Sequence, residues 1–133
     1  MMSDLHNESL HDAELIQLSI DRDNWSVCLG FRLENGVRRS VHLDGVVAIR
    51  GEDLILQNVV SRVLRSTRGD LSKDAIDRLL TWVTSLSDAH SWLTDEHKSA
   101  LLAECENGTL ELVVFEPSAG TEIVAVCKSF VVT

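Results

Sequence analysis

A histidine and an aspartate stand side by side at positions 11 and 12, just before a stretch in which apolar and polar residues alternate. Such a pair can act as a general base when the carboxylate orients the imidazole through a hydrogen bond. Neighbouring residues of a strand point to opposite faces, however, which argues against a dyad. We therefore expect His11 and Asp12 to hold backbone groups at the entrance of a strand.

A second arrangement would join this pair to polar residues near the ends of other strands. Sites often form where loops leave a sheet, and His42 and Asp44 stand just before a turn at Gly45. A small enzyme or ligand-binding domain would then use a polar cluster of four residues, His11, Asp12, His42 and Asp44. That hypothesis requires the four side chains to converge on one concave pocket.

Residue spacing gives little support to other catalytic chemistry. The five histidines form no HExxH motif and no close His-x-His pair, so no metal site is predicted. The chain has no GxSxG elbow and no glycine-rich phosphate loop. Cys28 shares a strand face with Arg32, a cation that could activate its thiol, but a small residue that fills a sheet face is the simpler interpretation. No catalytic residue, cofactor or metal ligand is assigned.

The composition describes one folded domain over residues 1–133. Hydrophobic residues make up 44% of the chain and charged residues 25%, which are ordinary values for a globular domain of this size. Three cysteines, odd in number and far apart, exclude a disulfide framework, and Cys105 and Cys127 lie in apolar patterns typical of a core. With no leader and no run of about 18 apolar residues, we expect a cytoplasmic protein with no membrane contact.

The net charge of −9 limits the kind of partner. Nucleic-acid binding rests on cationic side chains that displace counterions from phosphates, so no nucleic-acid partner is expected. The acids concentrate in residues 4–23 and 74–106, and an acidic surface steers association toward basic proteins. The candidate partner surface consists of four acids, Asp74, Asp77, Glu104 and Glu106. The competing explanation is that these acids only keep the protein soluble.

Two-residue alternation predicts strands in the first half of the chain. Apolar and polar residues alternate over 13–20, 25–34 and 37–43, and the β-branched run 54–64 follows. Asn35-Gly36 is typical of a type I′ hairpin turn, in which both residues have positive φ. These segments predict an antiparallel meander of four or five strands over residues 12–65.

Polar residues in the last of these strands invite separate hypotheses. Asn58 is expected to be a structural anchor whose amide, if buried, finds backbone partners. Arg62, Arg65 and Arg68 are three residues apart and could form an anion patch, although Asp70 and the acidic N-terminal segment suffice to solvate or pair them.

The period changes to that of a helix after Ser72, a suitable N-cap. The pattern predicts a helix over 73–87, and a second helix from Thr94 to Asn107-Gly108. The residues expected to be buried by the first helix are Ile76, Leu79, Leu80 and Val83. The segment 121–133 is apolar on both faces, which is typical of a strand covered on both sides. The predicted fold is α+β: a curved antiparallel sheet, made of the N-terminal meander and a C-terminal hairpin, with two helices packed on one face.

The stretches "SLHDAELIQLSIDRDN" and "LGFRLENG", and more loosely "LQNVV", resemble a group of small bacterial proteins that includes an immunity-protein family of polymorphic toxin systems. The similarity covers about the first half of the chain. It implies a bacterial, cytoplasmic protein that neutralises a toxin by covering it. His11 and Asp12 match the motif, but the resemblance transfers no functional role to them.

The leading hypothesis is a non-enzymatic protein-binding module, an immunity-like inhibitor of a basic toxin. It rests on the missing catalytic motifs, the acidity of the chain and the resemblance. The alternatives are the small enzyme or ligand-binding domain built on the polar cluster, and a structural subunit of a larger assembly. The sequence does not indicate an oligomeric state.

Overall fold

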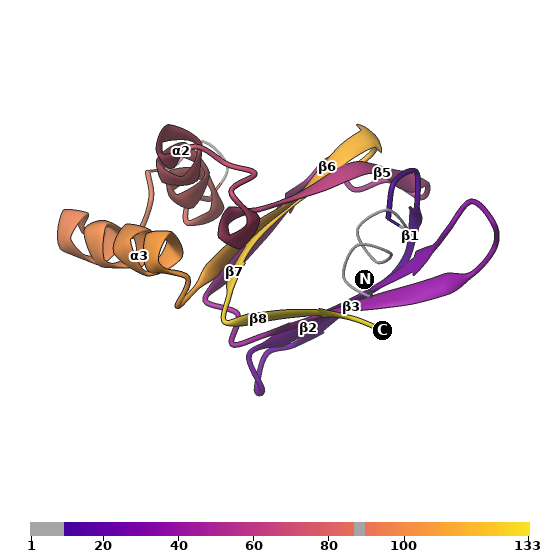
Figure 1. The fold of residues 1–133 in the computed structure, drawn as a ribbon, viewed down its shortest axis with the longest axis horizontal. Helices are drawn as coiled ribbons and strands as arrows, with labels where there is room; N and C mark the ends of the chain where they lie inside the picture. The colour runs from indigo at the N-terminus through magenta and orange to yellow at the C-terminus, as the bar shows by residue number, and fades with distance from the viewer. Residues whose placement is uncertain (1–9, 87–89) are drawn as a thin grey trace.

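The computed structural model describes residues 10–86 and 90–133 (Figure 1). The strands are β1 (Glu14–Asp21), β2 (Ser26–Arg32), β3 (Arg38–Asp44), β4 (Ala48–Glu52), β5 (Asn58–Arg65), β6 (Glu111–Ala119), β7 (Glu122–Cys127) and β8 (Ser129–Val132). The helices are a short 3₁₀ helix, η1 (Ser66–Arg68), and two α-helices, α2 (Lys73–Val83) and α3 (Asp95–Asn107).

The strands form one curved sheet in the order β4-β7-β6-β5-β1-β2-β3-β8, and every neighbouring pair is antiparallel. The sheet has two halves, β4-β7-β6-β5 and β1-β2-β3-β8. They join where Glu14 and Leu15 of β1 pair with Val59 and Asn58 of β5. In Figure 1 the sheet curves so that β2, β3 and β8 lie across from β5 and β6. The predicted α+β fold, with its antiparallel sheet and two packed helices, is confirmed.

The inner core lies between the two halves. Leu29, Phe31 and Val41 from one half share a buried cluster with Phe115 and Ala125 from the other. The rings of Phe31 and Phe115 stack with centroids 5.9 Å apart. Burying one Phe or Leu side chain in this way stabilises a fold by about 1.5–3 kcal/mol. The apolar residues that alternate along each strand supply these buried side chains, and their contacts hold the two halves together.

An outer core lies between the helices and the opposite face of the sheet. Ile76, Leu80 and Val83 of α2 are buried in one cluster with Leu112 and Val126, as the helical pattern predicts. Leu79, the fourth residue expected there, is half-buried. Because the two cores lie on opposite faces of β6 and β7, these central strands are covered on both sides, which confirms the interpretation of their apolar pattern.

Helix boundaries follow local hydrogen bonds. The Ser72 hydroxyl accepts from Ala75 N at 3.1 Å and the Thr94 hydroxyl from His97 N at 3.1 Å, so both N-caps form as predicted. The first helix ends at Val83, four residues earlier than expected. The hydroxyl of Thr84 donates to Leu80 O at 2.8 Å, a side-chain bond of the kind that competes with helix propagation.

Three details of the β segments differ from the sequence-based expectations. In the β2–β3 hairpin only Gly36 has a positive φ, +85°, so the turn is not type I′. The β5 strand begins at Asn58, and residues 54–57 stay outside the sheet. The run 121–133 is not one strand: it divides at Lys128, whose N donates to Asp44 O at 2.9 Å, into β7, which pairs with β4 and β6, and β8, which pairs with β3.

Asn58 explains why β5 begins where it does. The side chain is 5% exposed. Its Nδ2 donates to Ile55 O at 2.6 Å, and its Oδ1 accepts from Ile55 N at 3.1 Å and Thr121 N at 3.0 Å. A β-carbon on Gly120, where φ is +80°, would lie 2.3 Å from that Oδ1. The expected structural anchor is confirmed, and it requires glycine at the adjoining turn.

Candidate functional site

His11 and Asp12 lie in a turn before β1 rather than in the strand. Strand geometry would separate the two side chains, but Asp12 has a φ of +60° and they approach each other. His11 Nε2 is 3.3 Å from an Asp12 carboxylate oxygen. His11 Nδ1 donates to Ser61 O of β5 at 2.6 Å, and Asp12 N donates to Val60 O at 2.8 Å. Both contacts fix the chain to β5 where the two halves of the sheet join.

His42 and Asp44 lie on β3, on the other side of β1 and β2 from β5. His42 stands opposite Cys28 of β2, and its Nε2 is 3.1 Å from the Thr133 hydroxyl. Asp44 stands opposite Ser129 of β8. Among residues 10–86 and 90–133, the hydrogen bonds and ion pairs bring His11 to Asp12 but join neither of them to His42 or Asp44.

The thiols differ in their surroundings. Cys28 is half-buried on β2, and Arg32, its expected activator, contacts Glu14 at 3.5 Å. Cys105 and Cys127 are buried in the two cores, as expected. Burial, followed by nearby carboxylates, raises the pKa of Cys105 to about 11 and that of Cys127 to about 12, so both stay protonated and unreactive in the native protein.

The four acids of the candidate partner surface lie on the two helices, Asp74 and Asp77 on α2, Glu104 and Glu106 on α3. Two of them take part in ion pairs between the helices. Asp77 lies 2.8 Å from Lys98 Nζ, and Glu106 lies 3.6 Å from Lys73 Nζ. These lysines neutralise half of the carboxylates that were expected to face a basic partner.

Each of the three arginines after Asn58 has a carboxylate partner, which removes the basis for an anion patch. Arg62 lies 2.8 Å from Glu116, Arg65 lies 2.6 Å from Glu111, and Arg68 lies 2.9 Å from Asp70. Asp70 is the partner expected from the sequence, whereas Arg62 and Arg65 pair with glutamates of β6 rather than with acids of the N-terminal segment.

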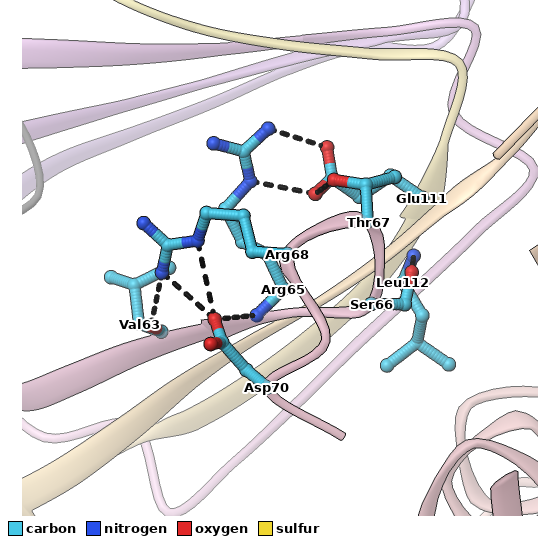
Figure 2. Close-up of polar contacts among 8 residues, drawn as sticks. All are labelled: Val63, Arg65, Ser66, Thr67, Arg68, Asp70, Glu111 and Leu112. Atoms are coloured by element: carbon cyan, nitrogen blue, oxygen red, sulfur yellow. Dashed lines mark hydrogen bonds and ion pairs between the residues drawn. The ribbon is translucent and has the colours of Figure 1, made fainter. Parts of the chain in front are cut away.

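The Arg65–Glu111 pair is the centre of a buried network that holds η1 against β6 (Figure 2). Nε and Nη2 of Arg65 donate to the two carboxylate oxygens at 2.6 and 2.8 Å, and the Thr67 hydroxyl donates to the same carboxylate. The Arg65 guanidinium also lies 4.2 Å from the ring centre of Phe130 on β8. One side chain therefore links β5, β6 and β8, which is a structural role.

Asp70 closes this network on the other side. Its carboxylate accepts from Arg65 N at 2.9 Å and from the Arg68 guanidinium. Burial alone would raise the pKa of Asp70, but these hydrogen bonds and the two positive charges outweigh it and hold the pKa below its usual value.

An uncovered apolar surface of the described residues lies elsewhere, between β1 and β4. A pocket of about 280 Å³ lies between the β1–β2 turn and β4, and another of about 200 Å³ lies between β1, β4 and the loop after β4. Both are lined by Ile20 and Ile49, and a third, of about 430 Å³, shares Trp25 and Val47 with the first. We call this surface the apolar groove; its main apolar residues are Leu18, Ile20, Trp25, Val47, Ile49 and Trp92.

The groove is open because β1 leaves its neighbour early. It pairs with β2 over its whole length, but with β5 only at Glu14 and Leu15. Leu18 stands opposite the fully buried Leu29 and so belongs to the inner face, yet it is 40% exposed, and Ile20 on the same face is 62% exposed. On the other side, β4 has a neighbouring strand, β7, on one edge only.

Two tryptophans flank the larger of the adjoining β1–β4 pockets. Trp25 is 54% exposed and Trp92 is 59% exposed. Trp25 has a φ of +53°, a conformation that bulky residues rarely adopt. Its carbonyl accepts from Val46 N at 2.8 Å, and the Arg22 guanidinium lies 4.1 Å from its ring centre. Backbone strain of this kind clusters at functional sites, so the conformation of Trp25 favours this surface as a candidate interaction site.

Carboxylates gather where β4 ends. Glu52 stands directly opposite Glu122 of β7, and Asp53 follows with a φ of +60°. Arg50 has two contacts here: its Nη1 donates to Trp82 O at 2.8 Å, and its Nη2 forms an ion pair with Glu52 at 3.4 Å. Like charges directly opposed on two strands destabilise the pair.

The sequence pattern does not predict the apolar groove. The alternating pattern placed Trp25, Ile20 and Leu18 on the apolar face of strands. Leu18 and Ile20 are exposed because β1 separates from β5, and Trp25 because it lies in the β1–β2 turn rather than in β2. No group of His, Cys, Asp or Glu residues that could hold a metal ion is found in the described part of the chain. None of the helices described is long and apolar enough to span a membrane. Neither a protein-family model nor a curated protein matches the chain.

Proposed function

We propose that this protein is a non-enzymatic protein-binding module whose partner occupies the apolar groove. The observation that carries the proposal is the pair of tryptophans, each more than half exposed, on one pocket. Tryptophan dominates binding energy at protein interfaces, and contiguous exposed apolar surface marks interaction sites.

The surroundings of the groove agree with this role. Its lining includes few groups that can transfer a proton or attack a substrate: the charged residues that line the three pockets are Asp21, Arg22, Arg50 and Lys128. The net charge of −9 favours a basic protein as the partner. With the resemblance of the first half of the chain, these features support an immunity-like inhibitor that covers a basic toxin.

A photo-crosslinking amino acid at position 47 tests the proposal. Val47 is 43% exposed and lines the groove, whereas Val37, 39% exposed in the β2–β3 hairpin, gives a matched control position. In the host cell, the variant with the crosslinker at position 47 should form one defined adduct that the control does not form.

The captured protein is then purified and its affinity measured by calorimetry. Trp25→Ala and Trp92→Ala should each weaken binding by about 30-fold, the loss typical of an interface hot spot, and Val37→Ala should not. A captured protein that binds the two tryptophan variants as well as the wild type contradicts the proposal.

A further inference from the structure

We propose that residues 53–57, the loop between β4 and β5, form a lid on the apolar groove. The lid alternates between the loop of this structure and an extension of β5 that pairs with β1 and covers Leu18 and Ile20. The inference rests on the proposed function and adds a regulation of that same surface, because a partner can enter this part of the groove only while the lid is open.

The loop exposes apolar side chains of a kind that favours a strand. Leu54, Ile55 and Leu56 are 63%, 55% and 99% exposed, and leaving three consecutive large aliphatic side chains in water is unfavourable. Leu18 and Ile20 of β1 are also uncovered, and Leu54 lines the same pocket of about 200 Å³ as both of them. Uncovered apolar residues of the loop and of β1 therefore border one pocket.

β1 has a free edge on the side of this loop. It pairs with β5 at Glu14 and Leu15, and among the described residues no strand pairs with it on that side beyond Leu15. β5 begins at Asn58, which stands opposite Leu15, so residues 54–57 would continue the ladder along β1 if they were extended. The unpaired edge presents N–H and C=O groups that can bind such a segment.

A bulge in β1 determines the register of the extension. In the pairing of β1 with β2 the register shifts between Leu15 and Gln17, so Ile16 is the extra residue of the bulge. On the other side of β1, Leu15 pairs with Asn58. A regular continuation of β5 beyond this pair therefore places Gln57 opposite Gln17.

The next pairs of the extended ladder match the uncovered side chains. Leu56 would stand opposite Leu18, and two residues further along β1, Leu54 would stand opposite Ile20. All four side chains would lie on the inner face, to which Leu18 and Ile20 belong, and Ile55 would point to the other face. Since direct cross-strand neighbours contact each other, the closed lid would cover the two residues of β1 that the structure leaves exposed.

Asn58 holds the lid open. Its amide donates to Ile55 O at 2.6 Å and accepts from Ile55 N at 3.1 Å. At about 3.3 Å per residue, an extended chain separates Asn58 from Ile55 by about 10 Å and releases both hydrogen bonds. At the start of the lid, Asp53 has a φ of +60°, a strained conformation of the kind that clusters at switch regions. Closure exchanges the two hydrogen bonds for backbone bonds with β1 and for apolar contacts.

Disulfide trapping tests the register of the closed lid. The variant is Leu18→Cys/Leu56→Cys in a Cys28→Ser background. Directly opposed residues of antiparallel strands have Cα atoms about 4.5–5.5 Å apart, a separation that a disulfide can span, so mild oxidation should form an intramolecular disulfide. The matched control is Leu18→Cys/Ile55→Cys, whose second cysteine faces away from β1's inner face when the lid closes. The control should react at least about tenfold more slowly.

The crosslinked partner tests the regulation. The oxidised Leu18→Cys/Leu56→Cys variant should bind it at least about tenfold more weakly than the same variant after reduction with dithiothreitol, because a locked lid excludes the partner from this part of the groove. Circular dichroism confirms that both redox forms are folded.

Two results would overturn the inference. One is disulfide formation in Leu18→Cys/Leu56→Cys that is no faster than in the control, since the lid then does not close in this register. The other is equal partner affinity in the two redox forms. If Trp25→Ala and Trp92→Ala still weaken binding in either case, the proposed function stands and the lid alone is refuted.

Discussion

Two arginine–glutamate pairs bridge the same two strands, β5 and β6, and should differ sharply in their contribution to stability. The side chains of Arg65 and Glu111 are 20% and 7% exposed, whereas those of Arg62 and Glu116 are 63% and 36% exposed. The comparison holds the residue types and the strand pair constant, and it changes the burial of the pair together with the contacts of Arg65 with Phe130 and of Glu111 with Thr67. Double-mutant cycles with Arg→Met and Glu→Gln at each pair isolate the interaction energy.

The expected magnitude follows from the geometry of the buried pair. Glu111→Gln leaves the Arg65 guanidinium largely buried and without its charge partner, and Arg65→Met leaves the Glu111 carboxylate in the same state. Losing one partner of a buried pair costs about 3–5 kcal/mol, and because Arg65 keeps some contact with water we expect about 3 kcal/mol for each single variant. The double variant leaves no unpaired charge, so the coupling energy should be about 2 kcal/mol or more.

The measurement is urea unfolding of wild type, single and double variants, followed by fluorescence and extrapolated to water. The coupling energy of the Arg62–Glu116 cycle should be below about 1 kcal/mol and fall to within experimental error at about 0.5 M salt, because water and ions screen an exposed pair. Coupling in the buried cycle should persist in the same salt. Equal coupling energies in the two cycles would refute the assignment of the Arg65–Glu111 pair as a buried structural link.

Three further predictions follow from the surroundings of single residues. Asp70→Asn should lower the free energy of unfolding near pH 7, and the difference from wild type should shrink as the pH falls below about 4. The reason is that the pKa of Asp70 is lowered in the native protein, so its stabilisation is present above the ordinary value of 3.8 and disappears when the carboxylate is protonated. A difference unchanged in urea titrations down to about pH 2 contradicts this. Asp12→Ala should cost about 1 kcal/mol more than Asp12→Gly in the same assay, because a φ of +60° disfavours a β-carbon; equal losses argue against strain. At about pH 8, Ellman's reagent should label Cys28 in the native protein but Cys105 and Cys127 only after unfolding, and rapid native labelling that survives Cys28→Ser would show the prediction to be wrong.

Local periodicity predicted most of the fold. The helical stripe of Ile76, Leu80 and Val83 and the alternation around Leu29 each reflect one element packing on one face, so the sequence pattern carries the information. Asn58 was also predictable, since a buried amide inside an apolar strand must find partners.

Features that depend on where strands separate were not predictable. The apolar pattern of 121–133 is the same whether the chain continues straight or divides at Lys128 and pairs with two different neighbours. Likewise Leu18 and Ile20 have the pattern of core residues and are exposed only because β1 leaves β5 after Leu15. Periodicity assigns a residue to one face of a strand. Whether a distant segment covers that face is decided by the tertiary structure.

The pairing of β8 with β3 imposes an order on biosynthesis. His42 and Thr133 are in contact although they are 91 positions apart in the sequence. While the ribosome is still adding the intervening residues, β3 is the outer strand of an incomplete sheet and its edge is open to neighbouring nascent chains. Only when residues 129–132 leave the exit tunnel can β8 cover the open edge of β3, so β1, β2 and β3 have to form their part of the sheet before its outermost strand exists.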